Sequence, residues 1–200
     1  MTRAEQRRQT RERLLSSALE VFERRGYAES SLEEIAERAG YTRKAVYSNF
    51  SGKGELLLEI MERRFRSHVD RIESIVSREA TAERQAIDIG AVFSEYLTQE
   101  RDWEMLFHEF CSVASRDEEI GARFRSCFRD LKQALVRLVE EETKARGVEL
   151  TLPAERLVLG ISALFSGVSL EKLIDPVETD DALFGEVLGL VVASAVRTGS

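Results

Sequence analysis

The sequence predicts an all-α protein, in which a small N-terminal three-helix domain precedes a larger helical domain, with about nine helices in total. Only two of the 200 residues are proline, and no stretch alternates polar and apolar residues as a half-buried strand would. Apolar residues instead recur every three or four positions, between capping residues and glycines. A chain of this length can bury about 70% of its unfolded surface, so core size does not limit its stability.

The first 13 residues are rich in arginine and have no apolar stripe: they contain Arg3, Arg7, Arg8, Arg11 and Arg13. This segment is either a frayed tail or an arm that touches phosphates or an adjacent minor groove of DNA. A helix is expected from Thr10, because apolar residues then follow at helical spacing, and Gly26 is expected to end it.

The stretch from Ser30 to Lys53 has the spacing of a helix-turn-helix. Ser31 and Glu34 can form a capping box, so one helix is expected to begin at about Leu32. Gly40 can adopt the left-handed conformation that ends this helix. Thr42 is the next cap, and a second helix is expected to follow it as far as Phe50.

The helix after Thr42 has two different sides. Val46 and Phe50 form the apolar side, whereas the opposite side offers hydrogen-bond donors and a phenol but no carboxylate: Arg43, Lys44, Tyr47, Ser48 and Asn49. Such a side suits the major groove of DNA, although cations on an exposed helix are often merely solvated. Lys53, at the start of the next helix, together with free backbone N–H groups is predicted to hold a phosphate.

The charge distribution agrees with a DNA-binding head. The whole chain has a net charge of −7, but residues 1–66 sum to +3 and the remainder to −10. A small basic head and a separate acidic body would explain this asymmetry. We place the boundary after Lys53, which gives a DNA-binding domain of residues 1–53 and an effector-binding and dimerisation domain of residues 54–200.

Four helices are expected between Lys53 and Gly147, and they carry many aromatic side chains. These side chains either fill a core or line a cavity for an apolar or aromatic small molecule. The candidate ligand-binding residues are Phe65, His68, Phe93, Tyr96, Trp103, Phe107, Phe110, Phe124, Cys127 and Phe128. A histidine on an apolar stripe is more often a hydrogen-bonded core residue than a ligand contact, and this alternative stays open for His68.

The last two helices are expected after Pro153 and from about Asp181 to Arg197. The final one is apolar around most of its circumference, so it must be covered on more than one side. We therefore predict a two-fold dimer with a four-helix bundle at its centre. The candidate interface residues are Gly160, Ala163, Leu164, Gly167, Phe184, Leu188, Val191, Val192 and Ala195.

Several functional classes are not supported by the sequence. Two cysteines, Cys111 and Cys127, and no apolar leader lead us to expect a reducing cytoplasm. No stretch of about 18 uncharged apolar residues is present, so we expect no membrane-spanning segment. The spacing of histidines and cysteines fits no metal site, and we expect neither a metal nor another cofactor. No catalytic constellation is recognisable either.

The chain resembles the tetracycline-repressor (TetR) family of bacterial transcriptional regulators from Arg11 to Leu57. The resemblance is carried by LLSSALEVFERRGY and SSLEEIAERAGYTRKAVYSNFSGKGELL, and beyond them only by the layout of the helices. It implies a cytoplasmic homodimer whose heads read an operator in double-stranded DNA. The C-terminal domains would bind a small-molecule effector and dimerise through the last two helices.

The resemblance also implies roles for individual residues. The base-facing start of the recognition helix would comprise Thr42, Arg43, Lys44 and Ala45. Tyr47 matches a phosphate-contacting tyrosine, Ser31 a capping position and Lys53 the lysine that begins the next helix. Asn49 and Gly54 depart from the residues that many members have there.

The sequence therefore predicts a repressor that a small apolar or aromatic effector releases from a palindromic operator. Two alternatives are a helical enzyme that uses the aromatic cavity, and a helical ligand-binding or interaction protein without effector-controlled DNA release.

Overall fold

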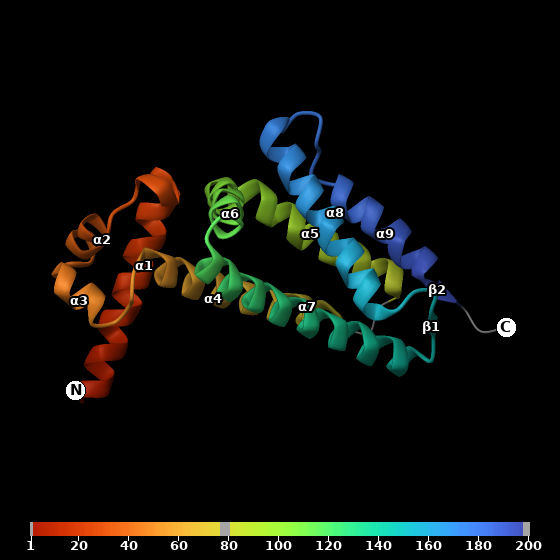
Figure 1. Ribbon diagram of the computed structural model, residues 1–200. Helices are drawn as coiled ribbons and strands as arrows, with labels where there is room; N and C mark the ends of the chain where they lie inside the picture. The colour runs from red at the N-terminus through yellow and green to blue at the C-terminus, as the bar shows by residue number, and fades with distance from the viewer. Residues whose placement is uncertain (1, 77–80, 198–200) are drawn as a thin grey trace. The chain divides into compact units, whose positions relative to one another are not determined.

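The computed structural model describes residues 2–76 and 81–197, except for the side chains of residues 82, 83, 86, 96, 99 and 197. Nine helices occur in these residues (Figure 1), which confirms the all-α prediction. They are α1 (Arg3–Glu29), α2 (Leu32–Ala39), α3 (Arg43–Tyr47), α4 (Lys53–Val76), α5 (Ala82–Gln99), α6 (Arg101–Ala114), α7 (Glu118–Arg146), α8 (Ala154–Ile174) and α9 (Leu183–Ala195).

The chain divides into two compact units. Unit 1 contains the residues up to Phe65 together with Met105–Cys127, and unit 2 contains Arg66–Glu104 and the residues from Phe128 onward. Helices α4, α6 and α7 therefore contribute residues to both units. The functional boundary after Lys53 stays a prediction, since compactness and DNA binding need not divide the chain at the same place.

Helix α1 begins earlier than the sequence analysis expected. Thr2 and Glu5 form a capping box, so the helix starts at Arg3 and not at Thr10. The arginine-rich segment is therefore helical, and the frayed-tail interpretation is wrong. At Gly26 the backbone turns to φ +78°, which interrupts the helix before it continues to Glu29.

Helix α3 is shorter than predicted and ends at Tyr47. The side chains of Ser48 and Asn49 both donate to the carbonyl oxygen of Ala45, at 2.9 and 2.8 Å. The backbone N–H of Asn49 donates instead to Val46, three residues back. The carbonyl oxygen of Ala45 is thus bonded by side chains and not by the backbone N–H of Asn49. The helix therefore ends, and a turn follows.

In unit 2 the closest helix crossing joins α5 and α9 at two glycines. A Cβ placed on Gly90 would lie 2.3 Å from the Cα of Gly185, so Gly90 has no room for a side chain, whereas a Cβ on Gly185 would lie 3.2 Å from the Cα of Gly90. Beside this crossing, the rings of Phe93 and Phe184 have their centroids 5.0 Å apart, and Phe165 lies 5.5 Å from Phe184. The core of unit 2 is therefore built partly from α9.

This packing corrects part of the predicted dimer interface. Phe184, Leu188 and Ala195 are only 1, 3 and 5% exposed in the single chain. Side chains that are already buried in unit 2 offer almost no surface to a partner. Helix α9 also ends at Ala195 and not at Arg197, because β2 (Val196–Arg197) pairs antiparallel with β1 (Glu149–Leu150).

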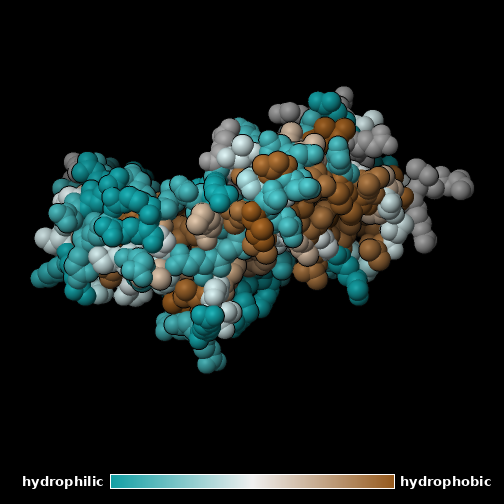
Figure 2. Space-filling model, turned by 90° about the horizontal axis from the view of Figure 1, so that it is seen from above, coloured by the Kyte–Doolittle hydropathy of each residue, from teal (hydrophilic) through white to brown (hydrophobic). Residues whose placement is uncertain are grey.

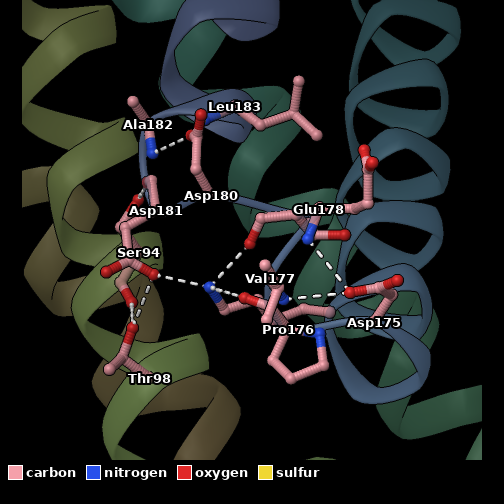
Figure 3. A network of polar contacts seen from close by, with 12 residues as sticks. Ser94, Thr98, Asp175, Pro176, Val177, Glu178, Asp180, Asp181, Ala182 and Leu183 are labelled. Carbon is pink, nitrogen blue, oxygen red and sulfur yellow. Dashed lines mark hydrogen bonds and ion pairs between the residues drawn. The ribbon is translucent and has the colours of Figure 1, made fainter.

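The loop between α8 and α9 is tied to α5 by a polar network (Figure 3). The ammonium of Lys172 donates to the carbonyl oxygen of Thr179 at 2.6 Å and to the carboxylate of Asp181 at 2.9 Å. Asp181 also accepts from the hydroxyl of Thr98 on α5, at 2.9 Å. The hydrogen bond from Lys172 is the main reason why the pKa of Asp181 is lowered. The network thereby places the start of α9 against α5.

Helix α8 presents a long apolar face. Leu159 and Leu170 on α8 are 54 and 45% exposed, and Leu190 on the neighbouring α9 is 69% exposed. Figure 2 shows apolar side chains gathered over this part of the surface. By length and composition, α8 is the one helix among the described residues that could cross a membrane, with a mean hydropathy of 1.7. Charged residues flank the uncharged run of residues 157–170 in this helix, so the expectation that no run of about 18 uncharged apolar residues is present still holds.

Candidate DNA-binding surface

The polar side of α3 is displayed to solvent. Val46 is fully buried and fixes α3 to unit 1, whereas Arg43, Lys44, Tyr47 and Ser48 are exposed. Helices α2 and α3 pack together, and α2 packs on α1 (Figure 1). The short α3 is thus held on a helical support with its cationic side outward.

Arg43 already has two partners within unit 1. Its guanidinium donates to the hydroxyl of Tyr47 at 3.0 Å and forms an ion pair with Glu33 of α2. These contacts, the hydrogen bond to Tyr47 first, raise the pKa of Arg43. The exposed side of α3 carries no acidic residue, but the carboxylate of Glu33 on α2 lies beside it. No sequence pattern indicated this pair, because the two residues lie on different helices.

Ser31 and Thr42 act as helix caps, as predicted from their spacing. The hydroxyl of Ser31 accepts from the backbone N–H of Glu34 at 3.1 Å, and that of Thr42 accepts from Ala45 at 3.3 Å. The carboxylate of Glu34, which the capping box would direct back to Ser31, pairs with Arg24 and Arg25 of α1. Whether the two caps and the half-buried Ala45 also contact DNA stays a prediction.

Asn49 faces inward, unlike the residues before it. Its amide nitrogen donates to the carbonyl oxygen of Ala45, and its amide oxygen is buried with no hydrogen-bond partner among the described residues. The backbone carbonyl of Asn49 accepts from Arg11 of α1. We therefore revise the predicted role of Asn49: it helps to end α3 and does not present its amide to bases.

The ammonium of Lys53, which was predicted to hold a phosphate, already has hydrogen-bond partners within unit 1. The ammonium donates to three backbone carbonyls, those of Tyr27 at 2.8 Å and of Ala28 and Ser30 at 3.0 Å. It also lies 4.7 Å from the centroid of the Tyr27 ring. Partial burial lowers the pKa of Lys53, although Glu109 and Glu29 oppose this. Since an ammonium has three donors, a phosphate could bind only by displacing these bonds.

Glu109 of α6 holds the other side of the same segment, and the sequence analysis did not identify it. Its carboxylate accepts from the backbone N–H groups of Tyr27 at 2.8 Å and of Ala28 at 2.7 Å. The kink in α1 favours glycine because φ is positive at Gly26, whereas a Cβ there would meet only the movable carboxylate of Glu109, at 2.7 Å. Lys53 and Glu109 together satisfy the backbone groups that the kink releases.

Arg11, in the N-terminal half of α1 and far from the kink at Gly26, contacts the segment that follows α3. Its guanidinium lies 4.0 Å from the centroid of the Phe50 ring and pairs with Glu59 of α4. One residue earlier, the hydroxyl of Thr10 donates to that of Tyr41 at 3.3 Å. Tyr41 precedes α3 and Phe50 follows it, so a single turn of α1 contacts both connections of the recognition helix.

The predicted ligand-binding residues fall into two groups. Unit 1 contains Phe65, Phe107, Phe110, Phe124 and Cys127, and unit 2 contains His68, Phe93, Trp103 and Phe128. Phe110 and Trp103 are almost fully buried, and the rings of Phe110 and Phe124 pack edge to face at 5.4 Å. The side chain of Tyr96 lies outside the described residues. A role of either group in ligand binding stays a prediction.

Other reactive side chains form no recognisable site. Within the described residues, no group of three or more histidines, cysteines and acids is placed to hold a metal ion. Neither Cys111 nor Cys127 forms a disulfide bond with a residue that the structure describes.

A two-helix motif with a tight turn, whose second helix exposes cations above a buried valine, defines a helix-turn-helix DNA-binding head. Residues 14–60 match the model of the bacterial regulatory proteins of the tetR family. The HTH-type transcriptional regulator TtgR of Pseudomonas putida is 25% identical over 192 residues, which span 92% of this chain and 88% of that protein.

Two solved structures have the same fold. The regulator FadR from Bacillus subtilis, in complex with stearoyl-CoA, has a TM-score of 0.73 at 18% identity, covering 91% of this chain and 97% of that one. SmeT, the repressor of the Stenotrophomonas maltophilia multidrug efflux pump SmeDEF, has a TM-score of 0.68 at 23% identity, covering 94% of this chain and 91% of that one. Residues 14–60 thus form a DNA-binding domain of the TetR type, and the named relatives are transcriptional regulators and not enzymes.

Proposed function

We propose that this regulator represses transcription by binding a palindromic operator as a homodimer, and that a small apolar or aromatic effector releases it. The observation that carries the DNA-binding half of this proposal is the exposed cationic side of α3, formed by Arg43, Lys44 and Tyr47. Arginine and lysine reading guanine edges are common specific contacts in the major groove, while tyrosine can hold a phosphate.

The experiment begins with selection of bound duplexes from a random DNA pool by the wild-type protein. The enriched sites should be palindromic, with half-sites about one helical turn apart or slightly more. Arg43→Ala should then weaken binding to the selected operator by about 1–3 kcal/mol and relax the preference at one position of each half-site. Failure to enrich any duplex would refute the proposal. Unchanged preference in Arg43→Ala would refute the assignment of base reading.

We propose that the dimer forms through the exposed faces of α8 and α9. Leu159, Leu170 and Leu190 expose large apolar side chains on these helices, and exposed apolar patches mark protein interfaces. Gly160, Ala163 and Gly167 are small and lie on α8, where they would let a second helix approach closely. Leu164, Val191 and Val192 are half-buried beside them. We propose that the occupant of this apolar face is a second copy of the chain and not a lipid membrane.

The effector half of the proposal is supported by the aromatic content of both units and by the complexes of related folds. FadR was solved with stearoyl-CoA, which has a long apolar acyl chain, and SmeT with triclosan, an apolar aromatic molecule. Titration with stearoyl-CoA and with triclosan, in the presence and absence of operator, tests for binding. Operator and effector must weaken each other by the same factor. Binding that operator does not affect would support a ligand-binding protein without effector-controlled release.

A further inference from the structure

We infer that the first two turns of α1 form a second DNA-contacting surface, in which Arg3 and Arg7 bind phosphates that flank the groove occupied by α3. This inference rests on the proposed DNA binding and extends it to residues outside the helix-turn-helix. The surface reads no bases, so its contribution is to affinity and placement and not to sequence preference.

The first turns of α1 are an ordered helix whose arginines lie in register. The capping box of Thr2 and Glu5 begins the helix at Arg3. With 3.6 residues per turn, Arg3, Arg7 and Arg11 lie on one stripe at intervals of four residues, and Thr10 lies beside it. Each step along this stripe advances about 6 Å along the axis. The arginine side chains are therefore displayed in a row.

The same stripe contacts the connections on either side of α3. Arg11 donates to the carbonyl of Asn49, just after α3, and Thr10 donates to Tyr41, just before it. The turns that precede Thr10 therefore continue the supporting stripe beyond the recognition helix. Figure 1 shows this segment of α1, in red, extending past α3 toward the N-terminus. Arg7 lies one turn and Arg3 two turns beyond the contact made by Arg11.

The charge of these turns is not neutralised within the chain. The carboxylate of Glu5 accepts a hydrogen bond from the backbone N–H of Thr2, and that of Glu12 forms an ion pair with Arg63 of α4. Arg3 and Arg7 are both exposed, and neither forms an ion pair with any residue that the structure describes. A phosphate is the partner that a guanidinium binds with two parallel hydrogen bonds.

The geometry of DNA supplies phosphates at this place. A helix seated in the major groove, which is about 12 Å wide, has a sugar–phosphate backbone on each side. A structural element that extends past the recognition helix must therefore meet one of these backbones. Two arginines spaced by one helical turn can reach neighbouring phosphates along the strand.

The test measures the salt dependence of operator affinity for the wild-type protein, for Arg7→Gln and for the Arg3→Gln/Arg7→Gln double variant. The probe is the operator selected by the wild-type protein. The slope of log affinity against log salt concentration should fall by about 0.9 for each phosphate that is no longer bound. Binding should weaken at low salt, and the relative affinities for the operator and its single-base variants should not change.

Arg13→Gln is the matched control. Arg13 is exposed on the same helix, about 120° around it from Arg7 and nearer to the middle of α1, so this substitution removes an equal charge away from the stripe. The slope for Arg13→Gln should equal that of the wild type. A wild-type slope in the double variant, or an equal fall in Arg13→Gln, would overturn the inference while leaving operator binding intact. A wild-type protein that selects no DNA would overturn both proposals.

Discussion

At the scale of single residues, we expect the ion pair between Glu33 and Arg43 to limit how readily α3 binds DNA. Both side chains are more than half exposed, so the ion pair adds little to folding stability. The carboxylate nevertheless competes with DNA for the guanidinium, and it repels phosphates. Glu33→Gln should therefore bind the selected operator more tightly, by up to about fivefold, given the ~0.2–1 kcal/mol of an exposed pair. Fluorescence anisotropy with labelled operator measures this change.

Glu37→Gln provides the control for net charge. Glu37 is exposed on the same helix α2, and its replacement removes an equal negative charge. A larger gain in Glu33→Gln than in Glu37→Gln would show that release of Arg43 matters. Equal gains in operator affinity would mean that only the overall electrostatic potential of the DNA-binding head had changed.

Lys53 leads to the second prediction at this scale. Its three hydrogen bonds to backbone carbonyls make it a structural residue of the α1 kink. Lys53→Met keeps much of the side-chain length but leaves these acceptors unsatisfied. We expect a loss of about 1–3 kcal/mol in the free energy of unfolding, measured by urea titration. The salt slope of operator binding should be unchanged at temperatures where the variant is folded.

Lys44→Met should give the opposite pair of results. Lys44 is exposed on the polar side of α3, so its removal should reduce the salt slope and leave stability nearly unchanged. If Lys53→Met instead lowered the salt slope without destabilising the protein, the sequence-based assignment of a phosphate contact would be restored.

At the scale of helices, local signals predicted more than non-local ones. Ser31, Gly40 and Thr42 cap helices where their spacing predicted, because capping depends on residues three or four positions apart. The early start of α1 was also encoded locally, in Thr2 and Glu5, although the apolar stripe alone suggested a later one. By contrast, Glu109 lies 82 residues from Tyr27 in the chain, and no local pattern could reveal that contact.

The crossing of α5 and α9 gives the third prediction. Gly90→Ala would place a Cβ 2.3 Å from the Cα of Gly185, and a backbone contact cannot be relieved by rotating a side chain. Separation of the two helices should cost about 1–3 kcal/mol in the free energy of unfolding. Gly189→Ala on α9 is the control, since its Cβ would meet no atom within 4 Å. It should be neutral or stabilising by up to about 1 kcal/mol. Equal stability of the two variants would contradict the crossing.

At the scale of the whole molecule, the sequence showed that α9 needs cover on several sides but not which neighbour supplies it. Residues of α9 that the periodicity suggested for a partner proved to be core, because α5 packs on that side. A hydrophobic pattern records that a face is buried and carries no information on whether the covering helix belongs to the same chain. The exposed leucines identify the side that remains for a second copy.

The dimer leads to the fourth prediction, since operator affinity depends on joining two heads. Leu159→Glu/Leu170→Glu would place two carboxylates on the apolar face of α8, where both leucines are about half exposed in the single chain. The variant should fold, but it should run as a monomer in light-scattering chromatography, because burying unpaired charges opposes association. Its affinity for a full palindrome should approach that for a single half-site.

Ile87→Glu tests whether any exposed charge has this effect. Ile87 is 55% exposed on α5 and lies outside the faces of α8 and α9. This variant should remain a dimer with wild-type operator affinity. Dimerisation that survives the double substitution on α8, or a monomeric variant that binds the palindrome as tightly as the wild type, would show that the two heads are joined elsewhere or act singly. The apolar face would then need a different occupant, and recovery of the wild-type protein in the membrane fraction would identify lipid as that occupant.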